Sequence, residues 1–377
     1  MNSSPPASRE LADQLKETAR GLGFTLVGIT AAARPETFEA LREWLRQGYH
    51  GTMEYISRRE SAYEHPEGVL SGVKSVILVG LPYGSGRGEN RGSAGHIAAY
   101  AQGGCDYHDV LRKRLRKLSD HLHQASPGCR TRCVVDTAPL LERDFARKAG
   151  LGWFGKNTML INKHIGSEFF LGAVLTDVEL PSDTPHDSSH CGTCTRCLEA
   201  CPTDAFPAPH VLDASRCISY LTIELRNASI PRTLRSGVGD WLFGCDVCQE
   251  VCPWNRKSEP STDPAFQPDP GNDIPLREWL TMSEPEFQSR FGNTPLSRPG
   301  RAGMARNASL VLGNRGSAAD FDDLLVGLDD PAPVVREAVI WSLWQMDPDR
   351  ARPVLETLRS SESDATVLRE IDLCLNE

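Results

Sequence analysis

Residues 191–202 read CGTCTRCLEACP, which places four cysteines on one short segment: Cys191, Cys194, Cys197 and Cys201, the last followed by Pro202. Two-residue spacers let the first three thiolates surround one iron–sulfur cubane. The fourth cysteine, followed by proline, can leave the loop and reach another cluster. A second run, residues 245–253 (CDVCQEVCP), repeats the last three cysteine positions and the proline. We therefore predict two [4Fe–4S] clusters in a ferredoxin-like module.

The second run lacks one local ligand, because Leu242 stands where its first cysteine is expected. Cys217 lies between the two runs and is the candidate for this place. We assign cluster one to Cys191, Cys194, Cys197 and Cys252, and cluster two to Cys201, Cys217, Cys245 and Cys248. Structural zinc also uses paired Cys-x2-Cys, but it needs only four ligands and leaves the tandem cysteines and the Cys-Pro unexplained. Two adjacent clusters conduct electrons, which predicts a reductase with an acceptor elsewhere in the chain.

The bulk properties favour a soluble protein of two or three domains. The 377 residues are 40% hydrophobic and 24% charged, enough for substantial cores. The N-terminal MNSSPPASRELADQ lacks the features of a secretory signal, and no apolar run approaches the roughly 20 residues of a membrane span. Clustered thiols at metal-ligand spacing suit a reducing compartment, so we expect a cytoplasmic location. The net charge of −9 argues weakly against a generic nucleic-acid binder but leaves room for a local basic face.

The chain divides into three segments of different texture. Residues 1–180 alternate helical and strand-like patterns, which predicts an α/β or α+β domain. Residues 181–260 carry the cysteine runs in short loops. After a proline-rich linker, residues 275–377 predict paired helices with Asp-Pro turns, a pattern typical of degenerate HEAT-like repeats.

The N-terminal segment shows no common nucleotide-binding signature. No G-x-G-x-x-G follows a strand, which disfavours NAD or FAD in a Rossmann fold. Asp106-Tyr107-His108 is similar to the D-x-H-x-x-G loop of base-off cobalamin proteins, but Leu111 stands at the glycine position. We interpret this partial match as chance.

Longer blocks of the sequence resemble the epoxyqueuosine reductase family over essentially the whole chain. The cluster module with its extra cysteine between the runs and the ending CDVCQEVCPWN (245–255) match this family. The other blocks are MEYISRR (53–59), YAQGGCDYH (100–108), VVDTAPLLER (134–143), KAGLGWFGKNTMLI (148–161) and GSEFFLGAVLTD (166–177).

The resemblance implies a base-off cobalamin between the N-terminal domain and the clusters, and epoxyqueuosine at the tRNA wobble position as the substrate. The product would be queuosine, and an external flavodoxin or ferredoxin would donate electrons to a monomeric enzyme. Two rivals remain open. One is a reductive dehalogenase-like enzyme acting on a small molecule, and the other is a ferredoxin-type electron carrier.

Asp136 is the predicted proton donor. By itself, an aspartate between a predicted strand and Pro139 is more often a turn or helix cap, but the resemblance of the block VVDTAP implies the acid. We expect its pKa to be raised by an apolar pocket. The resemblance also implies the residues that contact cobalamin: Arg58, Tyr100, Asp136, Trp153, Lys156, Asn157, Thr158, Ser219 and Asp246.

The predicted tRNA contacts lie in the helical tail. The basic stretch RKRLRK (112–117) is more often a solvated helix face, whereas a concave array of helices suits an anticodon stem. The candidates flank the first predicted tail repeat: Arg298, Arg301, Arg306 and Arg315. The wobble base would have to leave its stack to reach the pocket.

Overall fold

The computed structural model describes residues 6–84, 94–258 and 260–377. A four-stranded sheet forms the N-terminal part, in the order β1-β2-β7-β4, with every neighbouring pair antiparallel. The strands are β1 (Leu26–Ala31), β2 (Ser75–Pro82), β4 (Thr131–Val134) and β7 (Phe169–Thr176). Of the two predicted fold classes, the antiparallel sheet matches α+β.

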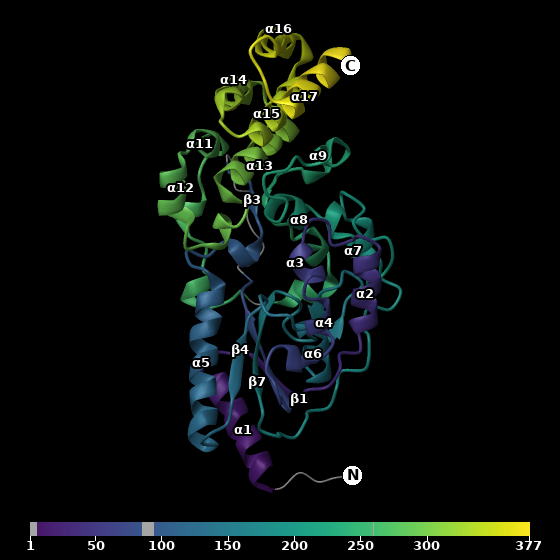
Figure 1. Cartoon of the computed structure of the whole chain (residues 1–377), viewed down its shortest axis with the longest axis vertical. Coiled ribbons are helices and arrows are strands. Elements are labelled where there is room, and N and C mark those ends of the chain that lie inside the picture. Colours follow the sequence, from purple (N-terminus) through teal and green to yellow (C-terminus); the bar gives the residue numbers. More distant parts are fainter. Residues whose placement is uncertain (1–5, 85–93, 259) are drawn as a thin grey trace.

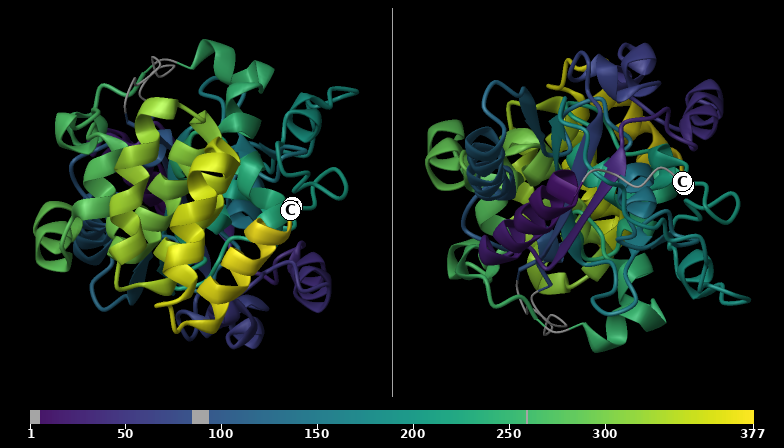
Figure 2. Two further views of the ribbon diagram at one scale, coloured as in Figure 1. Left: turned by 90° about the horizontal axis from the view of Figure 1, so that it is seen from above. Right: turned by 90° about the horizontal axis from the view of Figure 1, so that it is seen from below.

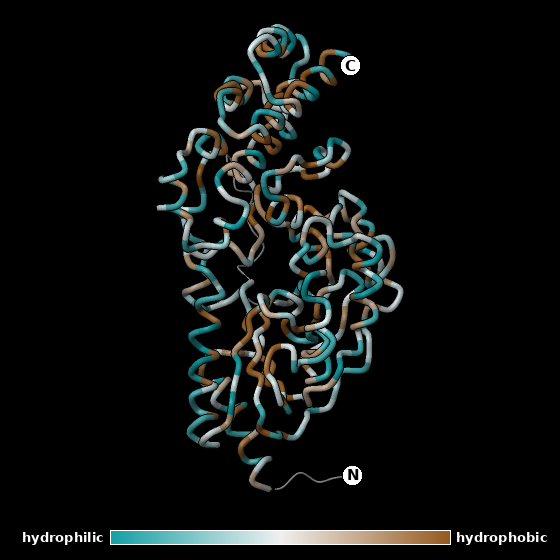
Figure 3. The backbone as a smooth tube through the Cα atoms, viewed as in Figure 1, coloured by the Kyte–Doolittle hydropathy of each residue, from teal (hydrophilic) through white to brown (hydrophobic). Residues whose placement is uncertain are grey.

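Helices cover both faces of this sheet (Figure 1). Side chains of β2 alternate between the faces, so Ile77 and Val79 pack with α1 (Pro6–Gly21) and α5 (Tyr107–Ala125). The intervening Val76 and Leu78 pack with α6 (Glu142–Lys148). Strand β2 is buried almost throughout, and the sheet forms the apolar centre of this part in Figure 3.

Short elements surround the sheet and hold the cysteine loops. Strand β8 pairs in parallel with β3, which attaches the cysteine-rich segment to the N-terminal part. These elements are α2 (Phe38–Arg46), α3 (Glu54–Ser57), α4 (Glu60–Tyr63), β3 (His96–Ile97), β5 (Trp153–Phe154), β6 (Leu160–Ile161), α7 (Arg196–Glu199), α8 (Ile218–Ile223), α9 (Arg232–Val238), β8 (Trp241–Phe243) and α10 (Val247–Glu250).

The tail is entirely helical in its described residues. Helices α11, α13, α15 and α17 pack against one another in succession, as the view from above shows (Figure 2). The bounds are α11 (Leu276–Thr281), α12 (Glu284–Phe291), α13 (Gly300–Arg315), α14 (Phe321–Leu325), α15 (Pro333–Met346), α16 (Pro348–Arg359) and α17 (Ala365–Asn376). The assignment of these helices to HEAT-like repeats stays a prediction.

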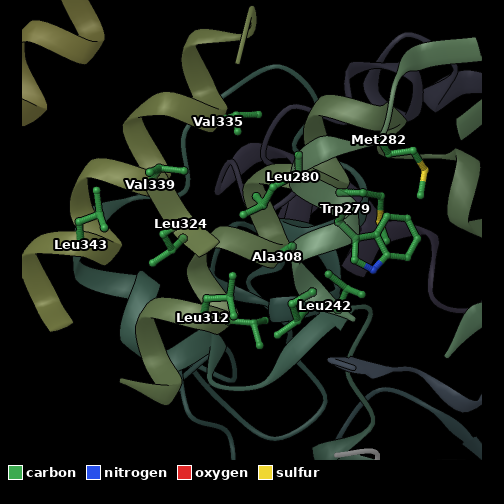
Figure 4. Packing of buried hydrophobic residues seen from close by; sticks show 14 of the residues in the cluster. Leu242, Trp279, Leu280, Met282, Ala308, Leu312, Leu324, Val335, Val339 and Leu343 are labelled. Atoms are coloured by element: carbon green, nitrogen blue, oxygen red, sulfur yellow. The ribbon is translucent and has the colours of Figure 1, made fainter. Parts of the chain in front are cut away.

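The core of the tail includes residues from the cysteine-rich segment. Leu242 of β8 lies among Trp279, Ala308 and Leu312 of the tail (Figure 4). A second core joins Tyr220 of α8 to tail residues. The part of the fold that holds the later cysteines is therefore built jointly with the tail. No helix in the described part of the chain is long and apolar enough to cross a membrane.

Candidate functional site: two thiol sets and a proton-holding carboxylate

The four thiols assigned to cluster one surround one cavity. Cys191, Cys194, Cys197 and Cys252 line a space of about 250 Å³, together with Lys156, Asn157 and Trp254. Three of these cysteines come from one loop and the fourth from the end of the second run. The loop thus brings together the set that its spacing predicts.

The thiols assigned to cluster two also lie near one another. The charges of Cys201 and Cys217 act on Cys248, and that of Cys217 acts on Cys245. Backbone N–H groups point at these sulfurs, including that of Ala205, which lies 3.3 Å from Cys201 Sγ. Amides directed at sulfur are typical of iron–sulfur loops. Among the described residues, no three His, Cys, Asp or Glu side chains are grouped to hold a single metal ion.

Asp136 lies between β4 and α6 in an unusual backbone conformation, with φ of 35°. Its Oδ1 is 2.6 Å from Nε2 of His108, and its Oδ2 accepts a short hydrogen bond from the Tyr107 hydroxyl. Nδ1 of His108 is 2.6 Å from Oδ1 of Asp106. A positive φ at a non-glycine residue costs free energy and is common at functional sites.

This arrangement determines where the proton resides. Burial alone would lower the pKa of His108, but hydrogen bonds to Asp106 and Asp136 raise it to about 9. Burial alone would raise the pKa of Asp136, but the hydrogen bond and charge of His108 hold it below the ordinary value. The prediction of a raised Asp136 pKa is therefore wrong for this structure, because a cation lies beside the carboxylate. Near neutral pH the pair shares one proton, carried on His108.

A second carboxyl group lies beside Asp136. Burial, together with the negative charge of Asp136, raises the pKa of Glu142 to about 8. The Oε1 atom of Glu142 is shielded from solvent and has no hydrogen-bond partner among the described residues. Glu142 was not among the predicted site residues.

An aromatic path joins Asp136 to the second thiol set. Tyr107 contacts Tyr100 edge-on with ring centroids 5.9 Å apart, and Tyr100 lies 6.2 Å from Phe243, two residues before Cys245. The carboxylate of Asp246 accepts a hydrogen bond of 2.6 Å from the Ala99 N–H. Tyr100 and Asp246 thus lie between the acid and the thiols.

Of the six other predicted cofactor contacts, most lie against the cysteine loops. Trp153 is buried against Cys191, Cys252 and Trp254. Lys156 Nζ donates to the carbonyls of Gly192 at 2.8 Å and Cys194 at 2.9 Å.

Asn157 donates to the Cys248 carbonyl at 3.1 Å, and Thr158, with φ of 66°, accepts from Arg143 through its carbonyl. The Ser219 N–H points at the Cys217 thiol, while Arg58 is exposed at the end of α3. Residues 153–158 therefore connect the N-terminal part to both cysteine loops.

The structure contradicts the predicted tRNA contact of Arg306, and it pairs the other three predicted arginines with carboxylates. Arg306 is 1% exposed and donates to the backbone carbonyls of Leu221, Leu225 and Ala228, so it cannot meet RNA in this fold. Its neighbour Arg301 forms a bidentate ion pair with the buried Asp330.

The other two predicted arginines, Arg298 and Arg315, lie at the two ends of α13. Arg315 pairs with Asp240, with an Nε–Oδ1 distance of 2.5 Å. Arg298 pairs with Glu224 at 2.7 Å, and its charge acts on Asp136 and Tyr107. Arg298 thus remains the candidate, at the pocket rather than on a distant concave face.

Sequence reasoning missed the residues that hold the proton. Asp106, Tyr107 and His108 were treated as a chance match, yet all three belong to the network around Asp136. The available signal was the position of this triplet inside the block YAQGGCDYH, at the start of a long helix.

Comparison with protein families covers both the cysteine loops and the network around Asp136. Residues 190–255 match a family described as "4Fe-4S double cluster binding domain", and residues 64–137 match "Epoxyqueuosine reductase QueG, DUF1730". The chain therefore carries a double-cluster binding domain.

Whole-length relatives share one name. Epoxyqueuosine reductase of Pseudomonas aeruginosa is 41% identical over 91% of this chain and 96% of its own length. The Escherichia coli protein of that name is 37% identical over 94% of each chain. A solved epoxyqueuosine reductase with an epoxyqueuosine-modified tRNA-Tyr stem loop is 33% identical, with a TM-score of 0.89, and the match covers 97% of this chain and 98% of that one.

Proposed function

This chain belongs to the epoxyqueuosine reductase family, and we propose that it reduces the epoxide of epoxyqueuosine in tRNA to the alkene of queuosine. The observation that carries the proposal is a proton-holding Asp136–His108 pair that ring contacts through Tyr107, Tyr100 and Phe243 connect to the second thiol set. A reductase of this kind needs an electron path and an acid at the same pocket.

Cys191, Cys194, Cys197 and Cys252 would hold the outer cluster. Cys201, Cys217, Cys245 and Cys248 would hold the inner one, which the aromatic path through Tyr100 connects to Asp136. An external one-electron donor, such as a flavodoxin or ferredoxin, would load the outer cluster.

A cofactor held between Asp136 and the inner thiols would meet both aromatic and polar groups. Tyr100 would offer an aromatic ring there, and Asp246 and the Ser219 backbone would offer polar groups. We propose base-off cobalamin as that cofactor, which would supply a strongly reducing cobalt. Of the other predicted contacts, Arg58, Asn157 and Thr158 complete the proposed set, whereas Trp153 and Lys156 lie at the outer thiols in this structure.

The protein supplies the acid. With its carboxylate hydrogen-bonded to protonated His108, Asp136 can pass that proton to the alkoxide formed when an epoxide carbon–oxygen bond breaks. His108 then neutralises, and Asp106 keeps its ring oriented through Nδ1. Tyr107 fixes the second carboxylate oxygen of Asp136.

The tRNA would approach from the side of Arg298, whose positive charge faces the pocket. We propose that the tail helices form HEAT-like repeats that support the anticodon stem, with segment boundaries near residues 180, 260 and 275.

A tRNA substrate also implies cytoplasmic action, and we propose a monomer.

The test is conversion of the substrate by protein purified without air. Iron, sulfide and cobalt are measured first, and nucleoside mass spectrometry then follows queuosine formation from epoxyqueuosine-containing tRNA. Asp136→Asn should keep metal and corrinoid while slowing turnover ~10²–10⁴-fold, the usual range for a general acid. The exposed Asp349→Asn is the matched control. Full activity of Asp136→Asn would remove Asp136 from the mechanism, and absent conversion by the wild type would refute the function.

A further inference from the structure

The reaction consumes two protons, but the Asp136–His108 pair holds one. Converting an epoxide to an alkene breaks two carbon–oxygen bonds, takes up two electrons and releases the oxygen as water. The first proton goes to the alkoxide and gives a hydroxyl group. The second must reach that oxygen as it leaves, because hydroxide is a poor leaving group.

Glu142 is positioned to hold the second proton. It opens α6, six residues after Asp136, and the Asp136 N–H faces its carboxyl group. Its Oε1 lies out of reach of solvent without a hydrogen-bond partner among the described residues. A carboxylate with one buried oxygen that lacks a partner would be costly, whereas a neutral acid tolerates such a place.

The groups that face Glu142 also favour the neutral form over a tight ion pair. Asp136 lies on the preceding loop and repels a second negative charge. Arg143 and His108 are the nearby cations. His108 already serves Asp106 and Asp136, and Arg143 donates to the Thr158 carbonyl. From α4, Tyr63 also faces the Glu142 carboxyl.

We propose that Glu142 carries the second proton of the reaction and delivers it to the pocket beside Asp136. This inference rests on the proposed reduction of an epoxide. The two electrons come from the external one-electron donor through the clusters. After turnover, Glu142 and the Asp136–His108 pair have each lost one proton, and both are reloaded from water.

Infrared spectroscopy tests the proton on Glu142 without substrate. Holoprotein should show a protonated-carboxyl stretch that titrates near pH 8, and this component should vanish in Glu142→Gln. The exposed Glu17→Gln in α1 is the matched control and should keep the band. A Glu142→Gln spectrum that retains every protonated-carboxyl component of the wild type would overturn the inference.

Single-turnover rates test the use of that proton. Glu142→Gln keeps the size of the side chain but has no acidic proton, so the rate near neutral pH should fall ~10–100-fold. In the wild type the rate should fall as pH rises through about 8, and this fall should disappear in the variant, leaving the decline near 9 from His108.

The outcomes separate the two proposals. Wild-type protein that cannot convert the substrate refutes the reduction itself, whereas a normal rate and pH profile in Glu142→Gln overturns only the role of Glu142. If Glu142→Gln fails to retain its clusters, Glu142→Asp decides. A shifted midpoint of the fall near pH 8 in the rate profile of Glu142→Asp supports the role of Glu142, because the shorter acid lies in a different environment. An unchanged midpoint rejects that role.

Discussion

The two thiol sets differ in how the chain builds them. Cys191, Cys194 and Cys197 lie on one loop, and only Cys252 must come from elsewhere. The inner set collects Cys201, Cys217, Cys245 and Cys248 from three separate stretches. The first site is thus largely local, while the second is a product of tertiary structure.

This difference couples the inner site to the tail. Strand β8 directly precedes Cys245, and its residues Leu242 and Phe243 belong to the tail core. Helix α8, directly after Cys217, is bonded to Arg306 of α13 through the Leu221 carbonyl. A tail that positions RNA would therefore also hold the cluster nearest the acid.

The largest effect should come from removing one ligand of each set. Cys194→Ala and Cys248→Ala should each lose about one cluster, because a cubane needs its four thiolates. Only Cys248→Ala should also raise amide hydrogen exchange in α8 and β8, since its site is shared with the tail core. Iron analysis and hydrogen-exchange mass spectrometry measure both effects. Equal exchange in the two variants would refute the distinction.

A smaller effect is expected from Arg306→Met. The variant leaves the carbonyls of Leu221, Leu225 and Ala228 without their donor, at a cost on the order of 3 kcal/mol in the free energy of unfolding. The exposed Arg350, which pairs with Asp322, is the matched control, and Arg350→Met should cost less than about 1 kcal/mol. Chemical denaturation of the holoprotein measures both. Similar values for the two variants would show that α13 does not support the inner site.

The sequence predicts the features that depend on spacing along the chain. The cysteine runs predict the double-cluster module, the alternating patterns predict two candidate fold classes for the N-terminal part, and the longer blocks predict the family. The comparisons confirm the family. The role of each cysteine as an iron ligand stays a prediction. Cys217 could be proposed only because the second run lacks a first cysteine.

The sequence fails where burial and neighbours decide the role. Arginines on a helix look alike in sequence, yet Arg306 is buried while Arg298 faces the pocket. The pKa of Asp136 depends on His108, which lies 28 residues away and approaches only when α5 packs on the sheet. Such pairings require the fold before the chemistry can be read.

The smallest effect should come from Lys156→Met, which tests the outer site alone. Lys156 donates to the carbonyls of Gly192 and Cys194 on the cluster-one loop, so its loss should cost ~1–2 kcal/mol of local stability. Chelators should then remove cluster one faster, while cluster two, held by the tail core, should keep its wild-type rate. Arg196→Met removes an exposed cation from the same loop and controls for charge. Electron paramagnetic resonance during chelation can follow the two clusters, and equal acceleration of both losses would show that the sites are not independent.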